Sequence, residues 1–126
     1  MKLVILSVGK SHDDTSSALI SYYQVKILRY APVEWLFIPH DVTKEKEGIK
    51  ILERIKKEDY VVLLDEKGRD MKSEAFAELV ENRMVDSVRR IVFIIGGAYG
   101  VSSDVEKRAN YVWKLSALVF PHMLVR

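Results

Sequence analysis

Five short apolar runs, separated by longer stretches with helical spacing, constrain the fold of this chain more than any other feature. The runs occupy residues 2–8, 33–38, 60–64, 91–95 and 111–115. Three of them are almost wholly apolar, which is typical of strands buried on both faces of a sheet. The run 33–38 alternates instead, so we expect it at an edge. Strands that alternate with helices predict an α/β fold, in which helices sandwich a mostly parallel sheet.

The stretches between these runs carry the helical signals. Apolar residues recur at helical spacing in three of them: Ala18, Tyr22 and Val25; Ile49, Leu52 and Ile55; and Phe76, Ala77, Leu79 and Val80. Ser103 and Glu106 have the spacing of a capping box, so we expect a fourth, short helix to begin there. The charged stretch 41–48 is expected to be an open connection.

The composition fits one domain spanning residues 1–126. With 48% hydrophobic and 30% charged residues, the chain can bury a single core. It has no cysteine, which excludes disulfides and a cysteine nucleophile, and its three histidines are too far apart in the sequence to suggest a metal site. No apolar stretch is long enough for a membrane span or a signal peptide, so we expect a cytoplasmic protein with no membrane partner.

Residues 94–100, Ile-Ile-Gly-Gly-Ala-Tyr-Gly, form the sharpest local motif, in which a buried strand runs into glycines just before a capped helix. Ligands of open α/β sheets bind beyond the carboxyl ends of the strands, and glycine lets the backbone approach a ligand closely. The motif has neither the dinucleotide-binding spacing nor the Lys-Ser/Thr ending of a phosphate loop. It therefore indicates either a ligand site of another kind or a tight turn that needs glycine.

Two further strand ends are candidate parts of the same site. Residues 64–69 are expected to form a polar turn after the third strand. Residues 115–122 have no periodic pattern and end in Pro-His, so they are expected to form an apolar loop. Such a loop can hold a flat heteroaromatic ring such as adenine, or it can simply face the core.

Basic residues are numerous but nearly balanced by acidic ones, which gives a net charge of +2. This charge is far below the excess of a protein that binds nucleic acid by charge alone, so RNA binding would need local patches. Four basic residues fall on one predicted helical face, and glutamates are interleaved with them: Lys46, Lys50, Arg54 and Lys57. The pattern favours a solvated, salt-bridged face over an RNA surface.

Four motifs, taken in order, resemble the RlmH family of bacterial SPOUT-class methyltransferases. They are residues 1–10, the Leu64-Asp65 turn, residues 95–100, and residues 115–122 with Arg126. The resemblance runs nearly from end to end. It implies an α/β fold with a deep trefoil knot and a homodimer. It also implies S-adenosylmethionine as methyl donor and methylation of a pseudouridine at N3 in large-subunit ribosomal RNA on the ribosome. We expect no metal and no DNA partner.

The resemblance also implies which residues line the methyl-donor site. They are Leu64, Gly97, Ser116, Ala117, Leu118, Val119, Phe120 and Pro121. Because the N3 imide of a uracil ring is largely protonated at neutral pH, methylation needs a base or a stabilising cation. His122 and Arg126, beside the proposed pocket, are the candidates for these two roles, although Pro-His can also be a structural turn.

The sequence departs from the family pattern in two places. In the family, a long helix and a tail bearing His and Tyr follow the Pro-His element, whereas this sequence stops at Arg126; its segment between Pro39 and Lys46 is also shorter. We therefore expect weak methyl transfer, lower stability or self-association, and an incomplete knot and dimer. The alternatives are a non-catalytic relative that binds donor or RNA, and another nucleotide-binding α/β protein that shares only the glycine loop.

Overall fold

The computed structural model describes residues 1–9, 22, 25, 31–97 and 100–114. Its strands are β1 (Lys2–Val8), β2 (Val33–Ile38), β3 (Tyr60–Asp70), β4 (Arg90–Ile95) and β5 (Tyr111–Lys114). Its helices are α2 (Lys44–Glu53), α3 (Ser73–Val85) and α4 (Ser103–Arg108). The strands form one sheet in the order β2-β1-β4-β3-β5, and every neighbouring pair is parallel. The predicted α/β class is confirmed.

The sheet places the most apolar strands in its middle. The central strand β4 pairs with β1 on one side and with β3 on the other, and its residues from Ile91 to Ile95 are buried. The alternating strand β2 lies at an edge, as predicted. Burial on both faces explains why β4 reads as a continuous apolar run.

Strand β3 corrects one expectation. Residues 64–69, predicted as a polar turn, are instead part of the strand, which continues to Asp70. The register with β5 shifts between Leu64 and Arg69, both of which pair with Trp113, so residues 65–68 form an irregular bulge. The Asp65 carboxylate accepts a hydrogen bond from the Lys67 N–H at 2.9 Å within it. The side-chain hydrogen bond typical of a turn is therefore present, but pairing with β5 resumes after the bulge.

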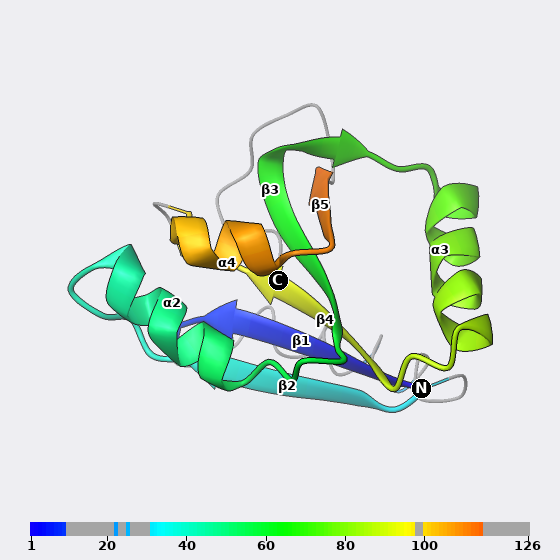
Figure 1. Ribbon diagram of the computed structural model, residues 1–126, viewed down its shortest axis with the longest axis horizontal. Coiled ribbons are helices and arrows are strands. Elements are labelled where there is room, and N and C mark those ends of the chain that lie inside the picture. Colours follow the sequence, from blue (N-terminus) through cyan, green and yellow to red (C-terminus); the bar gives the residue numbers. More distant parts are fainter. Residues whose placement is uncertain (10–21, 23–24, 26–30, 98–99, 115–126) are drawn as a thin grey trace.

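Two hydrophobic clusters lie on opposite faces of the sheet. Helices α2 and α4 lie together on one face, and α3 packs against part of the other (Figure 1). The larger cluster joins β1, β3 and β4 to Ile51 of α2 and Val105 of α4. The smaller contains Phe93 of β4, against which Phe76 of α3 packs; Phe76 also stacks on Trp113 with ring centroids 5.0 Å apart.

The helices confirm the predicted spacing only in part. Ile49 is 61% exposed, and the inward side of α2 instead carries Glu47, Gly48 and Ile51. The charged stretch 41–48 is not an open connection, because α2 already begins at Lys44. The cap of α4 is Ser102, not Ser103: its hydroxyl accepts from the Val105 N–H at 3.4 Å. The predicted helix around Ala18 falls mostly outside the described residues.

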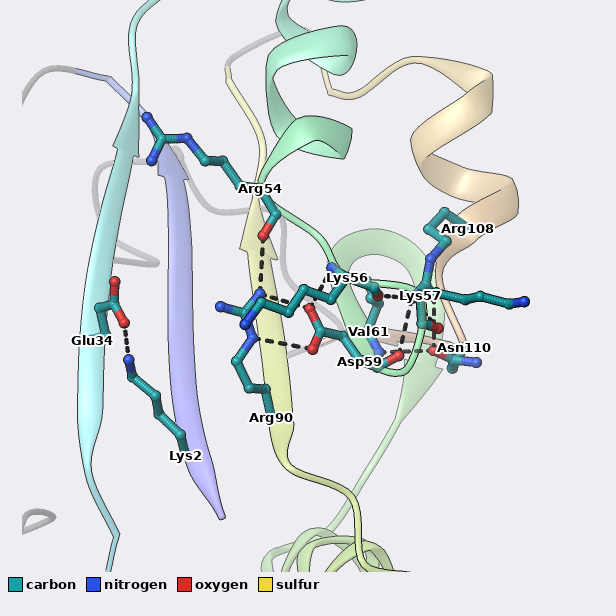
Figure 2. A network of polar contacts seen from close by, with 10 residues as sticks. All are labelled: Lys2, Glu34, Arg54, Lys56, Lys57, Asp59, Val61, Arg90, Arg108 and Asn110. Carbon is teal, nitrogen blue, oxygen red and sulfur yellow. Dashed lines mark hydrogen bonds and ion pairs between the residues drawn. The ribbon is translucent and has the colours of Figure 1, made fainter.

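A polar network joins the amino ends of the strands (Figure 2). Arg90 donates to both carboxylate oxygens of Asp59, at 3.1 and 2.6 Å, and to the carbonyl of Arg54. Arg108 donates to the carbonyls of Lys56 and Asp59. Burial alone would raise the pKa of Asp59, but the hydrogen bonds from Arg90 and from the Lys56 N–H outweigh it, so this pKa lies below its ordinary value. These two arginines thus connect the start of β4 and the end of α4 to the segment between α2 and β3.

Candidate functional site

The carboxyl ends of the parallel strands meet at one edge of the sheet, which we call the carboxyl edge. Here β1 runs into Gly9, and β4 runs into Gly96 and Gly97. Leu64 of β3 pairs with Ile95, two residues before Gly97. The fold therefore brings together Leu64 and Gly97, the two predicted donor-site residues that lie in the described part of the chain. Open α/β sheets bind their ligands at this edge.

Two glycines of the 94–100 motif serve the turn itself. The Gly100 N–H donates to the Gly97 carbonyl at 3.0 Å, and Gly100 has a φ of +83°, which favours glycine. A β-carbon at Gly96 would lie 2.7 Å from a methyl group of Val101, closer than real contacts allow. The interpretation as a tight turn that needs glycine therefore holds at positions 96 and 100.

Gly97 is different, because neither its backbone conformation nor packing against the described residues requires glycine there. It is not among the described glycines with positive φ. A β-carbon at this position would make ordinary contacts of 3.7 to 3.8 Å with Val8, Glu47 Oε1 and His40 Cε1. Val8, Glu47 and His40, which we call the cradle, therefore surround the position of this β-carbon at ordinary van der Waals distance.

A buried carboxylate forms one wall of this cradle. The Glu47 side chain is only 12% exposed, although Glu47 lies in the first turn of α2. Its Oε2 accepts the Asp41 N–H at 3.0 Å and lies 3.4 Å from His40 Nδ1. Asp41 is held in turn by Lys50 at 2.9 Å, and the contacts of Lys50 and the Val42 N–H lower the pKa of the Asp41 carboxyl. These polar contacts therefore fix the connection between β2 and α2 beside Gly97.

Sequence reasoning missed Glu47 because it was grouped with the glutamates of a solvated face. A signal was present, since Glu47, Ile51 and Ile55 stand four residues apart in one row of the helix. A glutamate in line with two isoleucines is expected to face inward. Its neighbour Gly48 is also buried: a β-carbon there would lie 2.3 Å from Ser102 Oγ, so α2 packs directly on the cap of α4.

The remaining predicted site residues lie outside the described part of the chain. They are Ser116, Ala117, Leu118, Val119, Phe120, Pro121, His122 and Arg126. Their expected roles in binding the donor and in moving a proton therefore stay predictions, as does the knot.

The four basic residues of the predicted helical face do not all lie on one helix in the structure. Lys46 and Lys50 lie on α2, whereas Arg54 is the residue that ends the helix and Lys57 follows it. Lys50 pairs with Asp41 and not with an interleaved glutamate. The single continuous face predicted from the spacing is therefore wrong.

The whole chain matches one protein family. The family model described as "Predicted SPOUT methyltransferase" matches residues 1–126. The chain belongs to the SPOUT methyltransferase family. It is 36% identical to the ribosomal RNA large subunit methyltransferase H of Christiangramia forsetii over 135 residues, covering all of this chain and 86% of the relative. Proteins of that name from Clostridium botulinum and Streptococcus agalactiae are 36% and 32% identical over 138 residues, covering all of this chain and 87% of each relative.

These matches confirm the resemblance that the sequence motifs predicted, including its end-to-end extent. Within the described ranges, no helix is long and apolar enough to cross a membrane. The same residues contain no group of three or more His, Asp or Glu side chains arranged to hold a metal ion.

Proposed function

We propose that this protein transfers a methyl group from S-adenosylmethionine to N3 of a pseudouridine in large-subunit ribosomal RNA. The observation that carries the proposal is the match of the SPOUT methyltransferase family model to residues 1–126. The name shared by the relatives specifies large-subunit ribosomal RNA as their substrate. The position of Leu64 and of the glycine motif at the carboxyl ends of adjacent strands supports a ligand site in this chain.

The donor would be held by residues at this edge. Leu64 and Gly97 come from adjacent strands, and the proposed loop 116–121 follows β5, which pairs with β3. The donor supplies an already activated methyl group, so the residues of the chain mainly have to align it with the nucleotide and exclude water. His122 is our candidate for taking the N3 proton, and Arg126 is our candidate for stabilising the resulting anion.

A methyl-transfer assay with isotope-labelled donor tests the proposal. The protein is incubated with assembled ribosomes that lack the modification, and the ribosomal RNA is digested to nucleosides and identified by mass spectrometry. We expect label in N3-methylpseudouridine, and less of it with Gly97→Val, whose methyl groups would fill the cradle. Donor binding without transfer would favour a non-catalytic relative. Binding of ATP in place of the donor would favour another nucleotide-binding protein.

A further inference from the structure

Helix α2 lies beside the segment that joins β4 to α4, and neither the sequence motifs nor the family resemblance gave this helix a role there. We propose that Glu47 is a positioning residue, which holds the backbone around Gly97 in the arrangement that binds the methyl donor. The inference rests on the proposed function, because it takes Gly97 as part of the donor site. It requires no contact between Glu47 and the donor.

The Glu47 side chain ties the connection between β2 and α2 to the helix. Its Oε2 accepts the Asp41 N–H at 3.0 Å and lies 3.4 Å from His40 Nδ1. The Asp41 carboxylate lies in turn 2.9 Å from Lys50 Nζ, about one turn further along α2. Asp41 is therefore bound to α2 through both its backbone and its side chain.

Of these two links, the one through Glu47 is the stronger. The Glu47 side chain is only 12% exposed, whereas that of Lys50 is 41% exposed. A backbone N–H bound to a carboxylate makes a stronger hydrogen bond than one between neutral groups, and removing the carboxylate leaves the N–H unpaired. An exposed ion pair contributes little by comparison. The position of the connection therefore depends mainly on Glu47.

The same connection borders Gly97. His40 belongs to it, and the cradle of His40, Glu47 and Val8 surrounds the place of a Gly97 β-carbon at 3.7 to 3.8 Å. Glycine has no side chain to restrict its backbone, so its conformation depends on its neighbours. Loss of the Glu47 side chain removes one of these neighbours and releases a second, since His40 lies next to the freed Asp41 N–H.

This loosening should affect donor affinity more than the transfer step. A protein whose binding arrangement is only partly populated has its affinity reduced by that fraction. Without Glu47, the arrangement at Gly97 is populated less often, and part of the binding free energy goes into restoring it. Once the donor is bound, the arrangement is restored, so the transfer rate at saturating donor should change little.

Calorimetric titration with S-adenosylmethionine and amide hydrogen exchange of the full chain test this role. Glu47→Ala removes the acceptor, whereas Glu47→Gln is the conservative variant, because its amide oxygen can still accept the Asp41 N–H. Glu45→Ala is the matched control at an exposed position of α2. Asp59→Asn controls for loss of stability, since Asp59 lies in the network at the amino ends of the strands (Figure 2). Thermal melts identify a temperature at which every variant is folded.

We expect Glu47→Ala to weaken S-adenosylmethionine binding by about tenfold, and Glu47→Gln to recover most of the wild-type affinity. The Asp41 and Gly100 amides should exchange faster in Glu47→Ala, because the Gly100 N–H donates to the Gly97 carbonyl. In the transfer assay, this variant should need more donor to reach a rate close to that of the wild type. Glu45→Ala and Asp59→Asn should bind the donor as the wild type does.

Four outcomes would contradict this role. Wild-type donor affinity in Glu47→Ala, or unchanged exchange at Gly100, would overturn it. An equal loss of affinity in Glu47→Gln would also overturn it, because that variant keeps the hydrogen bond to Asp41. So would an equal loss in Asp59→Asn, since any weakened fold would then bind the donor poorly. Failure of the wild-type protein to bind S-adenosylmethionine would instead overturn the proposed function itself.

Discussion

At the scale of single residues, the glycines near the carboxyl edge have different structural roles. Gly68 lies in the bulge of β3, where a β-carbon would be 2.6 Å from the Val112 carbonyl oxygen of β5. Because that atom belongs to the backbone of a paired strand, it cannot move aside. Gly97, in contrast, has room for a β-carbon. One glycine is therefore required by the fold, and the other is not required by the packing of the described residues.

This difference predicts opposite outcomes for two identical substitutions. Gly97→Ala should unfold at the wild-type temperature but bind S-adenosylmethionine more weakly, because the methyl group occupies the cradle. Gly68→Ala should lower the free energy of unfolding by about 1–3 kcal/mol, the usual cost of forced overpacking. Chemical denaturation and calorimetric titration measure the two effects. If Gly97→Ala binds the donor as tightly as the wild type, no ligand approaches this glycine.

Asp59 gives a second residue-scale prediction, on stability against pH. Its pKa is lowered in the folded protein, so its contribution is present above the unfolded value of about 3.9 and is lost as pH falls through the folded value. At pH 7, Asp59→Asn should cost about 3 kcal/mol, because Arg90, whose side chain is only 14% exposed, is left without its charged partner.

The measurement is urea denaturation of both proteins between pH 7 and pH 3. The difference in unfolding free energy between wild type and Asp59→Asn should shrink as pH falls below about 4, because the Asp59 carboxyl then binds a proton more readily in the unfolded chain than in the folded protein. Asp70→Asn is the matched control, since Asp70 is 67% exposed and lies 3.7 Å from Lys114. A constant difference across the range would show that the charge of Asp59 does not stabilise the fold.

At the scale of elements, the sequence predicted buried strands more accurately than strand segments with polar residues. The residues of β1 and β4 are apolar because both faces are covered, so the sequence alone located these strands to within one residue. The polar end of β3 reads as a turn, and only its distant partner β5 makes it a strand. Local sequence cannot reveal a pairing that depends on a segment more than forty residues away.

The site was predictable to a similar degree. Motif order and the polarity of a parallel sheet placed Leu64 and Gly97 at one edge, and the structure confirms that juxtaposition. Glu47 was missed because interleaved charges suggested a solvated helix. Its inward orientation depends on Gly48 allowing α2 to pack on α4, which is a tertiary contact.

The packing of α2 on α4 supports an element-scale prediction. Gly48→Ala places a methyl group against Ser102 Oγ and should cost about 1–3 kcal/mol of unfolding free energy. Ser102→Ala removes the helix cap and should cost about 1 kcal/mol. In the double variant the clashing oxygen is gone, so the combined cost should be smaller than the sum. Additive costs, measured by urea denaturation, would mean that the two positions do not touch each other.

At the scale of the whole molecule, the parallel sheet separates two edges with different roles. The amino ends of the strands lie at the opposite edge, which we call the amino edge and which carries the network around Asp59. In this network Arg90 and Arg108 are bound to carbonyl and carboxylate groups (Figure 2). The carboxyl edge carries the glycine turn and the cradle beside Gly97. Helix α2 connects the two, since it follows β2 and leads back to β3 (Figure 1). A large RNA substrate should therefore meet the molecule at the carboxyl edge.

Because α2 runs from the carboxyl edge to the amino edge, the four basic residues of the α2 segment form two pairs that can be tested against each other. Lys46 and Lys50 stand toward the carboxyl edge, where Lys50 pairs with Asp41, whereas Arg54 and Lys57 stand toward the amino edge. Arg54 and Lys57 meet the polar network only through backbone carbonyls, so their side chains can be exchanged without breaking it. Each pair removes the same charge when replaced by glutamine. Any difference between the two variants therefore reports position and not net charge.

If RNA phosphates meet α2 at the carboxyl edge, the variant Lys46→Gln with Lys50→Gln should flatten the salt dependence of ribosome binding, by about one unit of slope for each phosphate that is no longer neutralised. The variant Arg54→Gln with Lys57→Gln should keep the wild-type slope. Ribosome affinity measured across a series of salt concentrations gives both slopes, and thermal melts confirm that the folds are intact. If only the second variant changes the slope, the RNA meets the amino edge, and the reacting nucleotide could not lie beside Gly97. If neither changes it, the α2 segment is a solvated face, and other basic residues of the chain must bind the phosphates.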